Sequence, residues 1–184
     1  MKKKVSSIRA LDKGALDAFF VRLPKSEQDR INLKKKRADS IAARYVLSEI
    51  LRDLFGEDLS EKISCDKEGK PFIIGRPDIF VSLSHSDRVV AAVVSDRPVG
   101  IDIERIRTVS EKLKSRVCKK PTETDQEFFR IWTVKEAYLK AAGIKFSDML
   151  SLDITDLDER VIISSEITDG FMLSIAEIET KAKV

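Results

Sequence analysis

Two acidic side chains stand two positions apart in the run Val99-Gly100-Ile101-Asp102-Ile103-Glu104. Apolar residues alternate with them, which predicts a strand whose isoleucines face a core while Asp102 and Glu104 share the other face. Two carboxylates about 7 Å apart on a strand repel each other unless a cation lies between them. Mg²⁺ prefers such hard oxygen ligands and completes its shell with water and phosphate oxygens. Gly100 leaves room for a ligand or another backbone segment, and the alternative is an amphipathic strand with one solvated face.

A third carboxylate lies in the run Trp132-Thr133-Val134-Lys135-Glu136-Ala137-Tyr138-Leu139-Lys140. On a helix, Trp132, Glu136 and Lys140 follow one another at i, i+4 and i+8 and lie within an arc of about 80°. The apolar stripe lies on another face and consists of Phe128, Ile131, Val134, Tyr138 and Ala142. One interpretation is an exposed Glu136–Lys140 ion pair, whose order is the favourable one. The other is a functional surface, because tryptophan seldom lies alone on an open surface.

Two short runs could bind an anion. Lys70 lies in the turn sequence Gly69-Lys70-Pro71, where its ammonium group can hold a phosphate as a point charge. Ser84 and His85 lie at the end of an expected strand, where hydroxyls and an imidazole can surround a phosphate. A Ser-His nucleophile pair is disfavoured, because neighbours on a strand point to opposite sides. A purely structural histidine is the remaining alternative.

The elements that must position these residues follow from periodicity and turn signals. We expect a short strand over residues 5–10, a helix around residues 14–23, and a stronger helix over residues 41–55 that ends at Gly56. A hairpin is expected with strands at residues 80–84 and 89–95, followed by a strand at 99–104 and a loosely helical charged segment at 110–125. A strong helix over residues 128–142 ends at Gly143, and two final strands are expected at 161–167 and 171–178.

The same order of elements occurs twice along the chain: strand, helices, strand and hairpin. Placing Val46 on Val134 superimposes the two strongest helices, and Asp87 and Asp169 occupy corresponding hairpin turns. The sequence therefore predicts an α+β fold of two similar subdomains related by pseudo-twofold symmetry, each a small antiparallel sheet packed with helices. Their expected bounds are residues 1–96 and 97–184, with the active site at the seam between them.

Composition excludes several classes of protein. The hydrophobic fraction of 42% supports a packed core, and a net charge of +3 does not indicate a nucleic-acid binder. The basic runs 34–37 and 112–120 also lack interleaved aromatics, so a nucleic-acid surface is only a remote alternative. One histidine and two distant cysteines argue against zinc sites and a disulfide framework. Because the sequence has no apolar run of membrane-spanning length, it predicts a cytoplasmic protein without membrane contact.

Four stretches in this order resemble the 4′-phosphopantetheinyl transferase superfamily, specifically its surfactin-type (Sfp-like) branch. They are Gly69-Lys70-Pro71, Phe80-Val81-Ser82-Leu83-Ser84-His85-Ser86, Pro98-Val99-Gly100-Ile101-Asp102-Ile103-Glu104 and the run from Trp132 to Lys140. The resemblance implies a monomer with the fold of two similar subdomains described above, and coenzyme A bound at the seam between them. It implies that Asp102, Glu104 and Glu136 ligate Mg²⁺ on the pyrophosphate and that Lys140 contacts the phosphates. The residues around the adenosine 3′-phosphate end would be Arg44, Lys70, Pro71, Ser84 and His85.

The implied reaction is a holo-[acyl-carrier-protein] synthase activity. A serine of an apo acyl or peptidyl carrier protein attacks the β-phosphate of coenzyme A and releases 3′,5′-ADP. Glu136 is the candidate proton acceptor, and Asp102 and Lys140 are the other candidate catalytic residues. The alternative is a non-catalytic member of the same fold that binds coenzyme A or a carrier. The stretch after Ile106 is shorter than is typical of the branch. The carrier protein can belong to fatty-acid, polyketide or nonribosomal peptide synthesis.

Overall fold

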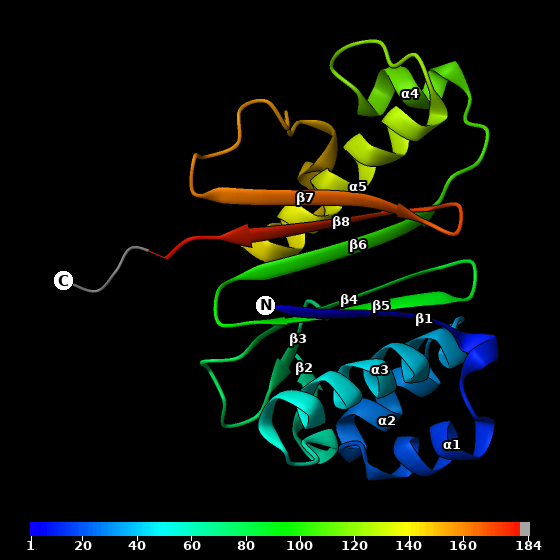
Figure 1. Ribbon diagram of the computed structural model, residues 1–184, viewed down its shortest axis with the longest axis vertical. Helices are drawn as coiled ribbons and strands as arrows, with labels where there is room; N and C mark the ends of the chain where they lie inside the picture. The colour runs from blue at the N-terminus through cyan, green and yellow to red at the C-terminus, as the bar shows by residue number, and fades with distance from the viewer. Residues whose placement is uncertain (181–184) are drawn as a thin grey trace. The chain divides into compact units, whose positions relative to one another are not determined.

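The computed structural model describes residues 1–180 as an α+β protein in which small antiparallel sheets pack against helices. The chain divides into two compact units, the first comprising Met1–Asp96 and the second beginning at Arg97. Each unit has a three-stranded sheet of its own (Figure 1). The α+β class predicted from the sequence is therefore confirmed.

The sheet of the first unit has the strand order β1-β5-β4. Its strands are β1 (Lys2–Ser7), β4 (Phe80–Ser86) and β5 (Val89–Ser95), and all neighbours are antiparallel. Asp87 and Arg88 connect β4 to β5 with positive φ angles of 44° and 64°. This is the two-residue turn geometry whose twist matches that of a hairpin. A separate two-stranded ribbon consists of β2 (Ile63–Cys65) and β3 (Pro71–Ile73).

Three helices cover this unit's core: α1 (Lys13–Arg22), α2 (Lys25–Asn32) and α3 (Arg37–Phe55). The long helix α3 buries a face that includes Val46, Leu47 and Ile50 in the same core as β4 and β5. It ends at Gly56, whose φ of 70° is the left-handed conformation that glycine adopts at helix C-termini. Single 3₁₀ turns lie at Ile8–Ala10 and Ser60–Lys62.

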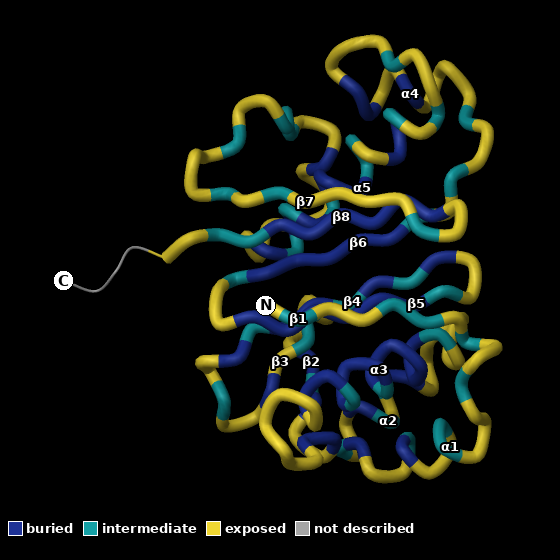
Figure 2. Tube along the Cα trace, viewed as in Figure 1, coloured by how far each residue is buried: buried dark blue, intermediate teal, exposed yellow. Residues whose placement is uncertain are grey.

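The sheet of the second unit has the order β6-β8-β7, from β6 (Val99–Arg105), β7 (Val161–Thr168) and β8 (Phe171–Ile178). Helix α5 (Asp125–Ala142) packs on β6 and β8, while β7 is largely exposed (Figure 2). The short helix α4 (Glu111–Val117) and a 3₁₀ segment (Phe146–Leu150) complete the unit. Asp169 and Gly170 form the β7–β8 turn, again with positive φ angles.

Most of the expected elements are confirmed, and the differences have physical reasons. The first strand lies at residues 2–7 rather than 5–10, because pairing of Lys2 with Val94 and Ser7 with Val89 fixes its register. Helix α2 was not predicted, since only Glu27 and Ile31 of its polar sequence are buried. The segment 110–125 is helical only over α4. No helix in the described part of the chain is long and apolar enough to span a membrane.

Candidate functional site

Three carboxylates from two elements of the second unit form one cluster. Asp102 and Glu104 lie on β6, and Glu136 lies on α5, which packs against that strand. One oxygen atom from each of the three side chains lies within 4.8 Å of the others. The prediction that Asp102 and Glu104 share a strand face is confirmed. The solvated-face alternative is wrong for Asp102, whose side chain is 2% exposed, whereas Glu104 retains 23%.

Lys140 joins the cluster from the next turn of α5. Its Nζ donates hydrogen bonds to Asp102 Oδ1 at 2.7 Å and to the Ile101 carbonyl oxygen at 3.0 Å. The Lys140 Nζ and the Glu136 Oε2 lie 3.7 Å apart. The Glu136–Lys140 ion pair that the sequence left open therefore forms, but not as an exposed surface pair. Lys140 instead connects α5 to β6 beside the carboxylates, with its own side chain 32% exposed.

The charges of the cluster are unbalanced. Burial and, next, the neighbouring Asp102 carboxylate raise the pKa of Glu136 to about 8, although Lys140 acts in the opposite direction. Burial alone would lower the pKa of Lys140, but Asp102 and Glu136 outweigh it and the pKa is raised. Three ionised carboxylates outnumber the cations beside them, which are the Lys140 ammonium and the Arg107 guanidinium, 3.6 Å from Glu104 Oε2. A proton on Glu136 reduces this excess, and a divalent cation would cancel it.

Trp132 lies at the edge of the same cluster. Its ring packs against Phe128 at a centroid distance of 5.9 Å, and it lines a cavity of about 170 Å³ together with Glu104, Leu113 and Phe129. Thr124 positions this end of α5, because its Oγ1 accepts a hydrogen bond from the Glu127 N–H at 3.1 Å. The expected face of Trp132, Glu136 and Lys140 thus borders the site.

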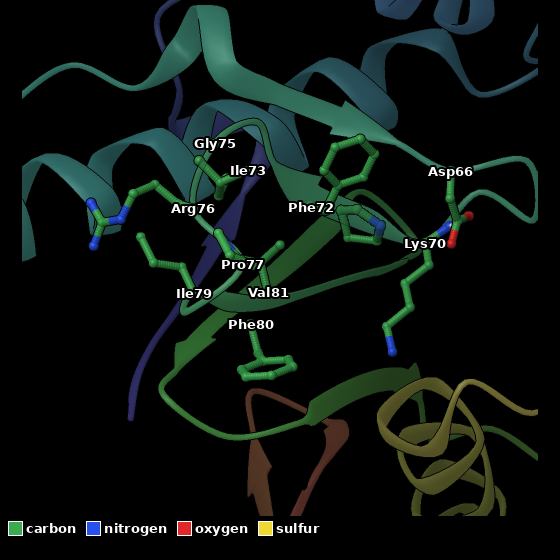
Figure 3. A pocket seen from close by; sticks show the side chains of 11 residues that line it. Asp66, Lys70, Phe72, Ile73, Gly75, Arg76, Pro77, Ile79, Phe80 and Val81 are labelled. Atoms are coloured by element: carbon green, nitrogen blue, oxygen red, sulfur yellow. The ribbon is translucent and has the colours of Figure 1, made fainter.

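The residues predicted to bind the adenosine end of coenzyme A all lie in the first unit. Lys70 and Pro71 line a pocket of about 390 Å³ with Asp66 and the apolar residues Phe72 and Phe80. Figure 3 shows Lys70 and Asp66 at one end of this pocket. Burial lowers the pKa of Lys70, and Asp66 partly opposes that effect.

Ser84 and His85 are neighbours on β4, with Ser84 buried and His85 half-buried. The His85 Nδ1 lies 3.6 Å from Asp39 Oδ2, and Asp39 belongs to the first turn of α3. Asp39 thus places a carboxylate beside the imidazole ring, at a distance longer than a direct hydrogen bond.

Arg44 is 3% exposed and already bonded to protein groups. Its Nε donates to Glu27 Oε2 at 3.0 Å, and its Nη2 donates to Cys65 Sγ at 3.1 Å. Its Nη1 donates to the Ser40 carbonyl oxygen at 3.0 Å. Arg44 is thus part of a buried network that joins α2, α3 and β2.

Lys135 is a buried cation whose environment the sequence reasoning missed. Its Nζ donates to the carbonyl oxygens of Val117 at 2.6 Å and Met149 at 3.3 Å, and burial lowers its pKa. A signal was available, because Lys135 lies seven residues after Phe128 and therefore on the apolar stripe of α5. These two hydrogen bonds from Lys135 connect the end of α4 and the 3₁₀ segment to α5.

Comparison with known proteins identifies one family. The profile of the 4′-phosphopantetheinyl transferase superfamily matches residues 98–181, which include all three carboxylates and Lys140. The 4′-phosphopantetheinyl transferase gsp of Aneurinibacillus migulanus is 30% identical over 159 residues, which are 70% of this chain and 66% of that protein.

Two further relatives carry the same description. The 4′-phosphopantetheinyl transferase Sfp of Bacillus subtilis (strain 168) is 29% identical over 59% of this chain and 53% of its own length. The 4′-phosphopantetheinyl transferase HetI of Nostoc sp. is 32% identical over 68% of this chain and 60% of its own length. The matches thus span between about half and two thirds of these curated relatives.

Proposed function

The chain belongs to the 4′-phosphopantetheinyl transferase superfamily, and we propose that it transfers the 4′-phosphopantetheine arm of coenzyme A to a serine of an apo carrier protein. The observation that carries this proposal is the cluster of Asp102, Glu104, Glu136 and Lys140 inside the segment that matches the family. The complete set of acids and the lysine favours catalysis over simple binding.

The cluster has the donor chemistry of a Mg²⁺ site. Its three side chains present hard oxygen atoms within 4.8 Å of one another, and burial, followed by the Asp102 carboxylate, raises the pKa of Glu136. Asp102, Glu104 and Glu136 would therefore hold the ion. When bound, Mg²⁺ supplies positive charge that neutralises the pyrophosphate of coenzyme A.

The protein's own groups then perform the transfer. Glu136 accepts the proton of the carrier serine, whose oxygen forms a bond to the β-phosphorus of coenzyme A. The bond from that phosphorus to the bridging oxygen breaks, and 3′,5′-ADP leaves. Lys140, held in place by Asp102 and the Ile101 carbonyl oxygen, stabilises the charge that develops on the leaving phosphate.

For the adenosine end, we propose that Lys70, Pro71, Ser84 and His85 surround the 3′-phosphate. Two observations support this assignment: the ammonium group of Lys70 lies at the end of a pocket, and His85 is half-buried with the Asp39 carboxylate 3.6 Å from its Nδ1. We propose that Arg44 supports the coenzyme site. Its hydrogen bonds to Glu27 and Cys65 hold β2, the strand that precedes Lys70, in place.

The two units are proposed to be subdomains related by pseudo-twofold symmetry, with the active site at their seam. Both three-stranded sheets place the last strand of the unit at the centre, and both hairpins turn through two residues with positive φ. We further propose that the protein acts as a monomer in the cytoplasm, a compartment in which the free thiols of Cys65 and Cys118 remain reduced.

A mass measurement tests this function. The protein is incubated with coenzyme A, Mg²⁺ and a panel of apo acyl and peptidyl carriers, and the intact carriers are weighed. The expected result is a carrier that gains one phosphopantetheinyl group, with no gain when the metal is chelated or when Asp102→Asn replaces the wild type. If coenzyme A binds and no carrier on the panel gains mass, the non-catalytic alternative is favoured.

A further inference from the structure

Helix α5 lies directly on the backbone of Gly100. A Cβ atom built on Gly100 would lie 1.9 Å from the Ala137 carbonyl oxygen and 2.7 Å from the Ala141 nitrogen. Both are backbone atoms of α5, so no rotation of a side chain can relieve the contact. Ala137, Ala141 and Ala176 form a small buried cluster at this point, and Ala176 is the ladder partner of Gly100 on β8. The helix and the strand thus approach to a distance that only glycine permits.

Backbone conformation does not explain this glycine. Gly100 lies in the regular part of β6, and it is not among the glycines with a positive φ angle. An alanine could adopt the same dihedral angles without strain. The need for glycine at position 100 is therefore a need for space beneath α5.

The close contact lies at the level of the carboxylate cluster. Ala137, which meets Gly100, directly follows Glu136 on the helix, and Asp102 is two residues beyond Gly100 on the strand. Lys140 crosses between the same two elements, to the carbonyl oxygen of Ile101 and to Asp102. The separation of α5 from β6 at Gly100 therefore sets the separation of Glu136 from the strand carboxylates.

We propose that Gly100 is a positioning residue for the metal site: by allowing α5 to rest on β6, it brings Glu136 within reach of a cation held by Asp102 and Glu104. This inference rests on the proposed function and adds a residue that touches neither metal nor substrate.

The geometry indicates how large the effect of a methyl group is. An ordinary contact distance for a Cβ begins at 3.4 Å, so α5 would have to move by about 1.5 Å at Ala137. Mg²⁺ requires ligand oxygens at about 2.0–2.1 Å in near-octahedral geometry, so a displacement of this size removes Glu136 from the shell. Asp102 and Glu104 stay in place on β6, so a site of two carboxylates remains that binds the ion more weakly than all three do.

The test measures binding of Mn²⁺ alone, followed by the electron paramagnetic resonance signal of the free ion, in wild type, Gly100→Ala, Ile175→Ala and Asp102→Asn. Ile175 is a matched control, because it is buried on the face of β8 that points away from α5. Its truncation removes buried apolar surface from the same sheet without adding a group between the helix and β6. Unfolding in urea identifies the conditions under which each variant is fully folded.

We expect Gly100→Ala to weaken Mn²⁺ binding at least tenfold and Ile175→Ala to leave it within twofold of wild type. A folded Gly100→Ala protein with wild-type Mn²⁺ affinity would overturn the inference while leaving the metal site intact. Failure of the wild type to bind Mn²⁺ more tightly than Asp102→Asn would overturn the metal site itself. Should Gly100→Ala not fold, Ala141→Ser provides a second variant, because it adds a hydroxyl group to the small alanine cluster between α5 and the sheet. We expect it to weaken Mn²⁺ binding about threefold, and unchanged binding would again overturn the inference.

Discussion

Replacing Glu136 by glutamine should change how stability depends on pH in the metal-free protein. Burial and the adjacent Asp102 raise the pKa of Glu136 from 4.5 to about 8 in the folded state. Between these two values the folded protein retains a proton that the unfolded chain releases. The free energy of unfolding of the wild type therefore falls as the pH rises through this window. Glu136→Gln removes this contribution, since glutamine does not titrate.

The size of the effect follows from the same two pKa values. One pKa unit corresponds to about 1.4 kcal/mol, so the wild type should lose about 2.5 kcal/mol relative to Glu136→Gln between pH 5 and pH 7. Urea unfolding, followed by the fluorescence of the single tryptophan, Trp132, measures both proteins at each pH. Saturating Mg²⁺ should reduce the difference, because the ion favours the ionised carboxylate. A difference between the two proteins that stays constant from pH 5 to pH 7 would refute the account of the charge balance.

Three further perturbations test other parts of the structure. Asp102→Ala should abolish transfer and also lower stability by about 2 kcal/mol, measured by urea unfolding, because it leaves Lys140 without its closest partner; wild-type stability would contradict the buried pair. Lys135→Met should cost about 2 kcal/mol, since the Val117 and Met149 carbonyl oxygens lose their shared donor. Its transfer rate per folded molecule should stay within a few-fold of wild type, and a complete loss would assign Lys135 to the chemistry. Coenzyme A at 100 times its dissociation constant should stabilise the protein by about 2.7 kcal/mol, visible as a higher melting temperature, and the shift should be larger with Mg²⁺; no shift would contradict coenzyme binding.

The predictable part of the site is the part that depends on local periodicity. The alternation around Asp102 and Glu104 specified a strand and a shared face, and the spacing of Trp132, Glu136 and Lys140 specified a helical face. Both patterns act over a few residues, so they can be seen in the chain itself. The turn residues Gly56 and Gly143 likewise marked the ends of the two long helices.

The remaining features depend on which elements meet in three dimensions. Asp102 is buried because α5 covers β6, and an alternating strand pattern does not say what covers its polar face. Arg44 is bonded to Glu27, which precedes it by 17 residues on another helix, so no local pattern reveals the pair. Helix α2 forms with few buried side chains, and its stability therefore depends on tertiary contacts more than on its own periodicity.

The catalytic role of Glu136 is tested by comparing the rate of a single transfer with the affinity for coenzyme A, in wild type and in Glu136→Gln. Glutamine keeps the size of the side chain and removes its charge and its ability to accept a proton. We expect a modest loss of affinity, because Lys70, His85 and Lys140 remain, and a fall in the single-turnover rate of about 10²-fold or more. Equal losses in rate and affinity would make Glu136 a binding residue only. An unchanged rate would contradict the proposed active site.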